Sequence, residues 1–488
     1  MIHSLKPYPS YKPSGVEWLG QVPAHWEVLR LKRVARINPS KSEVGSSMRS
    51  GSAVFLPMER VGSDGRIDTS DVRSVSELWN GLTYFRRGDV ILAKITPCFE
   101  NGKGACLDRL PTEIGFGSTE FHVLRALSRM HPRYLYRLTT LSEFRRLGTE
   151  EMTGAAGQQR VPTKFIAQFP VCVPPLPEQT AIARFLDYVD RKIRRFIRAK
   201  RKLIGLLEEQ KQALIHQAVT GAVDVRTGRP YPSYKPSGVE WLGQVPTHWR
   251  VNRLKQLTAG PLKYGANVAA EFTDKSWPRY IRITDFEPSV ALRDDTFRSL
   301  PPDVASEYAV QAGDVLLARS GATVGKAFLV GADAGPACHA GYLIRVRPDR
   351  EKLLGEFLFS FCQSCAFREW RSSILIMATI ENISAEKYAN LCIPVPPLEE
   401  QEAVVMWLCA RNERIDEVIR KKQHSLQLID ELRTRLIADV VTGKVDVREA
   451  AARLPDDQEE AEPDDAFVEE GSDMPGAEAE PETENAGV

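Results

Sequence analysis

The chain has 488 residues, 43% of them hydrophobic, and a formal net charge of +1, all ordinary for a globular protein of roughly three or four packed units. No run approaches the ~18 uninterrupted apolar residues of a membrane-spanning helix, and the N-terminal residues lack a signal-peptide pattern. These features exclude a membrane-embedded or secreted class, so we expect a cytoplasmic protein with no membrane partner.

The small net charge conceals two oppositely charged parts of the chain. From Leu454 onward there are fourteen acidic residues and no lysine or arginine, so residues 1–453 hold 65 basic against 50 acidic residues, a balance of +15. A basic body suits a polyanionic partner. The acidic tail, residues 449–488, is expected to be disordered because it cannot bury enough apolar surface to fold.

One sequence unit occurs twice, about 223 residues apart. Residues 7–26 read PYPSYKPSGVEWLGQVPAHW, and residues 230–249 repeat them with a single change, Ala24 against Thr247. Two shorter blocks also recur: GDVILAK at 88–94 with GDVLLAR at 313–319, and PPLPEQ at 174–179 with PPLEEQ at 396–401. The repetition predicts a pseudo-symmetric molecule with two similar halves.

The segments between these blocks, 27–175 and 250–397, contain short β-rich runs separated by Gly, Pro, Ser and Asp. Each also holds a helical stretch, at 134–147 and at 353–371. This texture predicts two compact α+β domains. The expected strands include Ala53–Leu56, Val90–Ala93, Phe121–Leu124, Tyr280–Ile283, Asp314–Ala318 and Tyr342–Val346.

Two long helices are expected over Glu178–Thr220 and Glu400–Thr442, each followed by a glycine, Gly221 or Gly443, in a left-handed cap. Apolar residues spaced alternately by three and four form a heptad pattern, which indicates a coiled coil. Neither helix can bury its seam alone, so an antiparallel pair is expected; the alternative is that each helix packs on its own domain. The seam residues are Leu186, Val189, Ile193, Phe196, Leu207, Leu214, Leu408, Ile415, Val418, Ile429 and Leu436.

Each half also carries two polar patches, one after the GDV strand and one before the PPL block. Backbone N–H groups, hydroxyls and cations suit DNA phosphates and base edges, with Gln and Asn as adenine readers and Arg as a guanine reader. The alternatives are a solvated hairpin for the first patch and helix N-capping for Asn382. The candidate DNA-binding residues are Lys94, Thr96, Asn101, Lys103, Gln158, Gln159, Arg160, Arg319, Ser320, Thr323, Lys326 and Asn382.

No catalytic or metal-binding residue is predicted. Among eight cysteines only Cys362 and Cys365 form a CxxC pair, and without a second ligand pair they are expected to be reduced core thiols. Residues 321–326 look like a phosphate loop, but three residues rather than four separate the glycines and Ala327 stands where Ser or Thr would hold magnesium.

YKPSGVEWLG-x-VP-x-HW, the Arg-Leu-Lys at 30–32 and 253–255, the GDVLLAR block and the PPLPEQ opening of a long helix resemble the specificity (S) subunit of type I restriction–modification enzymes, over residues 1–448. The resemblance implies target-recognition domains at 1–175 and 227–397, each reading half of an interrupted site in double-stranded DNA. It also implies spacer helices at 176–226 and 398–448 that form an antiparallel coiled coil, set the gap and dock two methyltransferase subunits.

The resemblance further implies that this chain binds no cofactor. S-adenosylmethionine would be bound by the methyltransferase subunits, and ATP and Mg²⁺ by motor–nuclease subunits. A self-contained nuclease and a structural scaffold are the competing functions. The missing metal and cofactor motifs argue against a nuclease, and the basic body and divergent inserts argue against a scaffold. The acidic tail at 449–488 departs from the family pattern.

Overall fold

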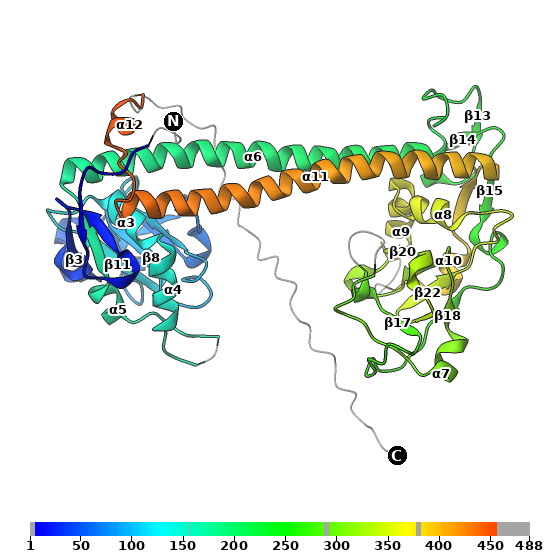
Figure 1. Ribbon diagram of the computed structural model, residues 1–488, viewed down its shortest axis with the longest axis horizontal. Helices are drawn as coiled ribbons and strands as arrows, with labels where there is room; N and C mark the ends of the chain where they lie inside the picture. The colour runs from blue at the N-terminus through cyan, green and yellow to red at the C-terminus, as the bar shows by residue number, and fades with distance from the viewer. Residues whose placement is uncertain (1–4, 156, 287–291, 377–381, 456–488) are drawn as a thin grey trace, which may run out of the picture. The chain divides into compact units, whose positions relative to one another are not determined.

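The computed structural model describes residues 5–155, 157–286, 292–376 and 382–455 (Figure 1). The chain divides into two compact units: unit 1 is Met1–Ile197 with Leu426–Val488, and unit 2 is Arg198–Ser425. Each unit combines a globular domain with part of both long helices. This division cuts through the helices, so the predicted limits between domains and spacer helices remain predictions, and most of the predicted acidic tail lies outside the described residues.

In its described residues, the domain of unit 1 is built on two four-stranded sheets, ordered β6-β5-β10-β7 and β4-β11-β8-β9. Strand β10 runs parallel to β5 and antiparallel to β7. Two strand pairs, β1-β2 and β12-β3, complete it. The strands are β1 Tyr11–Pro13, β2 Gln21–Pro23, β3 Glu27–Arg30, β4 Ala35–Ile37, β5 Ser52–Leu56, β6 Val72–Ser74, β7 Thr83–Arg86, β8 Val90–Ala93, β9 Gly104–Cys106, β10 Ile114–Gly117, β11 Phe121–Ala126 and β12 Pro170–Val173.

Unit 2 repeats this topology, although residues 33–84 and 256–309 share little sequence. Its described sheets, β16-β22-β19-β20 and β17-β21-β18, correspond to β4-β11-β8-β9 and β5-β10-β7, and again one pair, β17 with β21, is parallel. The predicted pair of pseudo-symmetric α+β domains is therefore confirmed. The strands are β13 Tyr234–Pro236, β14 Gln244–Pro246, β15 Arg250–Arg253, β16 Lys263–Tyr264, β17 Arg279–Ile281, β18 Ala309–Val310, β19 Val315–Ala318, β20 Ala327–Leu329, β21 Ala337–His339, β22 Leu343–Val346 and β23 Cys392–Val395.

Each helical stretch predicted within a domain is in fact two helices. In unit 1 they are α3 Pro132–Thr139 and α4 Ser142–Glu150, and in unit 2 they are α8 Gly355–Cys362 and α9 Cys365–Ile376. The break in unit 1 falls at Thr140, whose hydroxyl donates a hydrogen bond of 2.8 Å to the Arg137 carbonyl and so ends the helix. The shorter helices are α1 Ser46–Arg49, α2 Val75–Leu78, α5 Thr163–Gln168, α7 Pro302–Glu307, α10 Ala385–Ala389 and α12 Arg448–Ala452.

The long helices are α6, Leu176–Thr220, and α11, Leu398–Val441. As predicted, each is followed by a left-handed glycine, Gly221 at φ 77° and Gly443 at φ 80°. A Cβ at Gly221 would also lie 2.5 Å from Cδ of Pro246, so the cap needs glycine for its close packing as well as its backbone conformation. No helix in the described part of the chain is long and apolar enough to span a membrane.

Within each unit the two long helices pack against each other in opposite directions. In unit 1, Arg433 Nε donates to Asp190 over 2.9 Å, and Leu186 packs with Ile437. In unit 2, Lys211 Nζ lies 2.7 Å from Asp416, and residues later on α6 meet residues earlier on α11 in the same core. The expected antiparallel pair is thus present in both units.

The predicted seam residues are buried near the two ends of the helix pair, but toward its middle the buried residues lie next to the predicted ones. Among the predicted positions, Phe196 is 48% exposed and Val418 is 39% exposed, whereas the neighbouring Ile419 is 8% exposed. A straight helix turns about 20° per heptad away from a 3.5-residue repeat, which moves the contact line onto adjacent residues. The other predicted seam residues divide into the buried Leu186, Leu408 and Leu436 and the half-buried Val189, Ile193, Leu207, Leu214, Ile415 and Ile429.

Candidate nucleic-acid interface

The long repeated block attaches each domain to the start of a long helix. In unit 1, Glu178 near the start of α6 accepts hydrogen bonds from Trp26 Nε1 at 3.1 Å and pairs with His25 Nε2 at 2.9 Å. In unit 2, Glu400 near the start of α11 is held in the same way by Trp249, at 3.0 Å, and His248, at 3.0 Å. The near-identity of the two blocks therefore has a structural cause.

The glutamine of each PPL block has a structural role too. Gln179 Nε2 donates to the carbonyls of Arg129 and Pro174, and its Oε1 accepts from the His131 N–H. Gln401 makes the equivalent three bonds in unit 2, to Lys352, Pro396 and Leu354. Both side chains are fully buried, so all their polar capacity is used within the domain.

The GDV blocks position the first polar patch of each domain. Asp89 receives two hydrogen bonds from Arg125, and Asp314 receives two from Arg347, of 2.9 and 2.7 Å. Each aspartate also accepts the N–H three residues before it, which closes the predicted turn. The buried strands β8 and β19 follow, and Lys94 or Arg319 emerges directly after them.

In unit 1 the structure brings the two predicted patches together. Ile95 pairs with Arg160 in an isolated bridge, and the Thr96 N–H and hydroxyl both donate to the Gln159 carbonyl, at 3.0 and 3.1 Å. The Gln159 N–H returns a bond of 2.9 Å to the Thr96 hydroxyl. Loops about 60 residues apart in sequence thus form one surface.

Unit 2 makes the same connection. Ser320 pairs with Asn382, and the Ile383 N–H donates to the Arg319 carbonyl over 2.8 Å. Residues 377–381 of the second predicted patch lie outside the described residues. The N-capping alternative for Asn382 is wrong, because the N-cap of α10 is Ser384, whose hydroxyl accepts from the Lys387 N–H.

Several candidates in unit 1 are already engaged within the protein. Arg160 donates two bonds of 2.9 Å to the Glu120 carboxylate and a third to the Gln158 carbonyl. The Lys103 ammonium donates to the Met58 carbonyl at 3.3 Å. Because Thr96 also uses its hydroxyl internally, these three side chains hold the surface together. Whether they also contact DNA stays a prediction.

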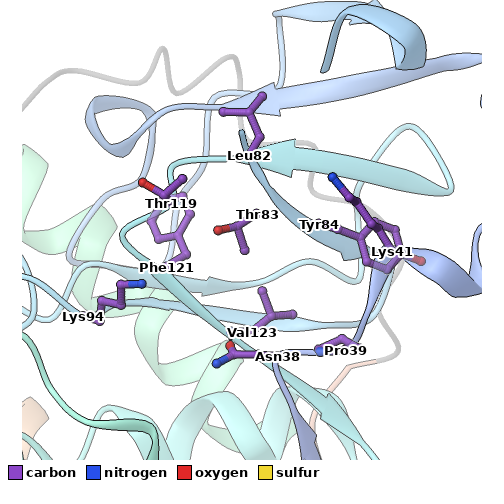
Figure 2. Close-up of a pocket in the computed structure, with 10 residues that line it drawn as sticks. All are labelled: Asn38, Pro39, Lys41, Leu82, Thr83, Tyr84, Lys94, Thr119, Phe121 and Val123. Atoms are coloured by element: carbon purple, nitrogen blue, oxygen red, sulfur yellow. Dashed lines mark hydrogen bonds between the residues drawn. The ribbon is translucent and has the colours of Figure 1, made fainter. Parts of the chain in front are cut away.

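Other candidates face outward. Asn101 and Gln158 are exposed in unit 1, and Lys326 is exposed in unit 2. Lys94 is half-buried and lines a cleft with residues from three other segments of the chain (Figure 2). These are the candidates with side chains most accessible to a ligand.

In unit 2 the equivalent of Lys94, Arg319, has different neighbours. The Arg319 guanidinium lies 4.9 Å from the centre of the Tyr264 ring, a cation–π arrangement. Ser320 and Thr323 are half-buried beside it. Among the described residues, no donor reaches the buried Oδ1 of Asn382. The first and second patches of the two domains therefore share a backbone frame and differ in chemistry.

Sequence reasoning missed three residues of this surface. The carbonyl of Glu120 accepts from the Lys94 N–H at 2.8 Å, and the carbonyl of Tyr342 accepts from the Arg319 N–H at 3.0 Å, so Glu120 and Tyr342 occupy equivalent positions. Tyr342 is 63% exposed, and Tyr264 is 42% exposed. Aligning the two halves on β11 and β22, each placed just after one of these residues, would have revealed the equivalence of 120 with 342.

Among the residues that the structure describes, no group of three or more His, Cys, Asp or Glu side chains is placed to hold a metal ion. The CxxC cysteines are free thiols, and burial raises the pKa of Cys362 well above its ordinary value. The pKa of Glu120 is lowered, chiefly by its hydrogen bonds from Arg160, so this carboxylate is ionised at neutral pH.

Comparison with known proteins places these features in one family. A family model described as the type I restriction modification DNA specificity domain matches residues 83–204 and 271–424. The EcoAI specificity subunit of a type I restriction enzyme from Escherichia coli is 37% identical over 182 residues, which is 37% of this chain and 30% of that protein. The MjaVIII specificity subunit from Methanocaldococcus jannaschii is 26% identical over 317 residues, 61% of this chain and 67% of that protein.

The EcoEI specificity subunit, also from E. coli, is 37% identical over 163 residues, 33% of this chain and 27% of that protein. The matched region is thus less than a third of the length of the EcoAI and EcoEI subunits. A chain from a solved structure concerning complex assembly and conformational transition of a type I R-M system shares the fold, with a TM-score of 0.66 and 20% identity, over 86% of this chain and 98% of that one. Since the family model covers more than half of its residues, the chain belongs to the type I restriction–modification DNA specificity domain family.

Proposed function

We propose that this chain is the non-catalytic DNA sequence-specificity subunit of a type I restriction–modification complex, acting in the cytoplasm. Each domain reads one part of a bipartite, interrupted target in double-stranded DNA. The proposal rests on one observation: equivalent backbone positions in the two domains carry different side chains. Unit 1 has Lys94, Glu120 and Arg160 at these positions, and unit 2 has Arg319, Tyr342 and Asn382. This combination suits the reading of two different half-sites, because the scaffold can stay fixed while the side chains that it presents to the DNA change.

Charge supports a nucleic-acid ligand. The chain before the acidic tail carries a balance of +15, and the candidate surface of each domain presents cations at the end of a buried strand. Contacts to phosphates supply most of the affinity of such proteins without sequence information, and base-edge contacts add selectivity. Both kinds of group are available on this surface.

The long helices are proposed to set the gap between the half-sites and to dock two adenine methyltransferase subunits. Large apolar side chains on these helices stay exposed within each unit, Leu206 and Met406 in unit 2 and Leu428 and Leu432 in unit 1, between 47% and 73%. Exposed apolar groups on long paired helices favour a protein partner. The partners would bring S-adenosylmethionine, and separate motor–nuclease subunits would bring ATP and Mg²⁺.

Genome-wide mapping of adenine methylation tests the proposal, in cells with the gene intact and with the gene deleted, and with expression of the locus confirmed. We expect methylation at one interrupted motif to disappear on deletion, which would also supply the target sequence. Unchanged methylation from an expressed locus would overturn the proposal and favour a scaffold without a DNA-reading role.

A further inference from the structure

A cleft of about 260 Å³ opens in the domain of unit 1, beside the candidate interface (Figure 2). One side is formed by the start of β7, and the other by β11 and the residues that follow β4 and β8. The cleft lies where the two four-stranded sheets of the domain meet. Its lining residues are Asn38, Pro39, Lys41, Leu82, Thr83, Tyr84, Lys94, Thr119, Phe121 and Val123.

The polar groups of the cleft are mainly hydrogen-bond donors and cations. Figure 2 shows Lys94 and Lys41 on opposite sides of the cleft, with Thr83 between them and Thr119 close to the Lys94 side. None of the ten lining residues carries a carboxylate. An anion entering the cleft therefore meets two positive charges and the hydroxyl groups of Thr83, Thr119 and Tyr84.

Lys94 is held by its backbone while its ammonium group remains available. Its N–H donates to the Glu120 carbonyl, and its carbonyl accepts from the Val161 N–H, both at 2.8 Å. In the described part of the chain its ammonium makes no hydrogen bond or ion pair, whereas those of Lys41 and Lys103 donate to the carbonyls of Trp79 and Met58.

The carboxylate of Glu120, the residue whose backbone carbonyl accepts from the Lys94 N–H, is already engaged by another side chain. The carboxylate of Glu120 is bound on both oxygens by Arg160, which leaves no ion pair to compensate the charge of Lys94. A cation that makes no hydrogen bond or ion pair among the described residues, beside hydroxyl donors in a concave site, is suited to an anionic oxygen.

We propose that this cleft binds a backbone phosphate of the DNA that unit 1 reads, with Lys94 as the charged donor and Thr83 and Thr119 as neutral donors. The inference rests on the proposed function and adds a contact that positions the domain on DNA without reading sequence. A phosphate fits better than a base edge, because two cations favour a full negative charge, and the Asn38 amide is already bonded to His122 and to the Val123 N–H. In unit 2 the residue equivalent to Lys94, Arg319, is stacked on Tyr264, so this contact is assigned to unit 1 alone.

The test uses the chain assembled with its methyltransferase subunits and a duplex carrying its own methylation motif. The equilibrium constant for binding is measured over a series of salt concentrations for the wild type and for Lys94→Ala. Loss of one phosphate contact should reduce the slope of log K against log salt by about 0.9. The methylated motif should stay the same. Lys94→Arg should restore the slope, and Lys164→Ala, which removes an exposed lysine of α5 outside the cleft, should leave it unchanged.

Duplexes with single methylphosphonate substitutions identify the phosphate. The wild type should lose affinity at one position in the half-site of unit 1, and Lys94→Ala should be indifferent to substitution at that position. Identical interference patterns for both proteins, or a changed motif with an unchanged slope, would overturn the inference. A third result would also overturn the inference. In it, inorganic phosphate at constant ionic strength weakens DNA binding by the wild type alone, and no methylphosphonate position lowers its affinity. The cleft would then bind a free anion rather than a DNA phosphate. Absence of sequence-specific binding by the wild type would instead count against the proposed function.

Discussion

Removing one heptad from both long helices tests whether the helix pair sets the gap in the DNA target. The ion pairs Asp190–Arg433 and Lys211–Asp416 fix the register, which places residues near 200 of α6 opposite residues near 425 of α11. Deleting residues 197–203 together with 422–428 therefore removes matched segments and keeps both ion pairs. Seven residues make nearly two turns, so the contact line shifts by only about 20°.

The expected change follows from helix and DNA geometry. Seven residues at ~1.5 Å each shorten both helices by about 10 Å. At ~3.4 Å per base pair, the gap in the methylated motif should shrink by roughly three base pairs. Three base pairs also turn the duplex by roughly 100°, so methylation by the shortened chain should be weaker than by the wild type.

Adenine methylation mapping in cells that express the shortened chain with its partners gives the result directly. The half-site sequences should persist with fewer bases between them. Deleting 197–203 alone is the matched control; it should abolish methylation because one helix then slides by about 10 Å against the other. Methylation of the original, full-length motif by the doubly deleted chain would refute the spacer argument.

Three further predictions concern single residues. Arg319→Ala should relax recognition of one half-site only, as read from the methylation motif; equal loss at both halves, or none, would remove Arg319 from the base readers. Asp190→Asn should lower the free energy of unfolding by about 3–5 kcal/mol, because Arg137 and Arg433 then lose a buried carboxylate. Lys211→Met, at a more exposed pair, should cost less than about 1 kcal/mol, and similar urea midpoints for the two assembled variants would contradict this ranking. Burial alone would raise the pKa of Asp190, but Arg137 and Arg433 hold this pKa below its ordinary value of about 3.9. Such a carboxylate stabilises the fold at pH values above its ordinary pKa, and this contribution is lost as the pH falls through its pKa in the folded protein. The difference in the free energy of unfolding between the wild type and Asp190→Asn should therefore narrow below about pH 4. A widening difference in urea midpoints would show that the sign is wrong.

Local sequence predicted the elements better than their partners. The strand Val90–Ala93 was predicted with its correct bounds, because a Gly-Asp turn precedes four apolar residues. The left-handed glycines after α6 and α11 were also predicted correctly. Nothing in the local pattern shows that β5 pairs parallel with β10, about 60 residues later, because such pairing depends on side chains across the sheet. The role of the long repeated block was hidden for the same reason, since its partner Glu178 lies some 150 residues away.

The candidate site shows the same division. Residue types predicted a polar, cationic surface, and the structure joins its two patches in each domain. The ion pair between Arg160 and Glu120, which lies 40 residues earlier, could not be predicted because no rule of sequence spacing links the two residues. Asn382 was considered as a helix cap because it precedes a helical segment, but Ser384 lies at the capping position. The cleft around Lys94 combines four segments of the chain, so only the folded domain reveals it.

Unit 1 is assembled from the two ends of the described chain. Lys6 pairs with Asp446, the Tyr11 hydroxyl donates to the Lys444 carbonyl, and Gly443 packs against Pro23 and Trp26. Unit 2, in contrast, is one uninterrupted stretch from Arg198 to Ser425. During synthesis the second domain can therefore complete its core first, while the first domain waits for a segment translated more than 400 residues after its opening strand. Ribosome stalling or proteolysis after residue 425 would spare the second domain and leave the first one without the later segment that completes its core.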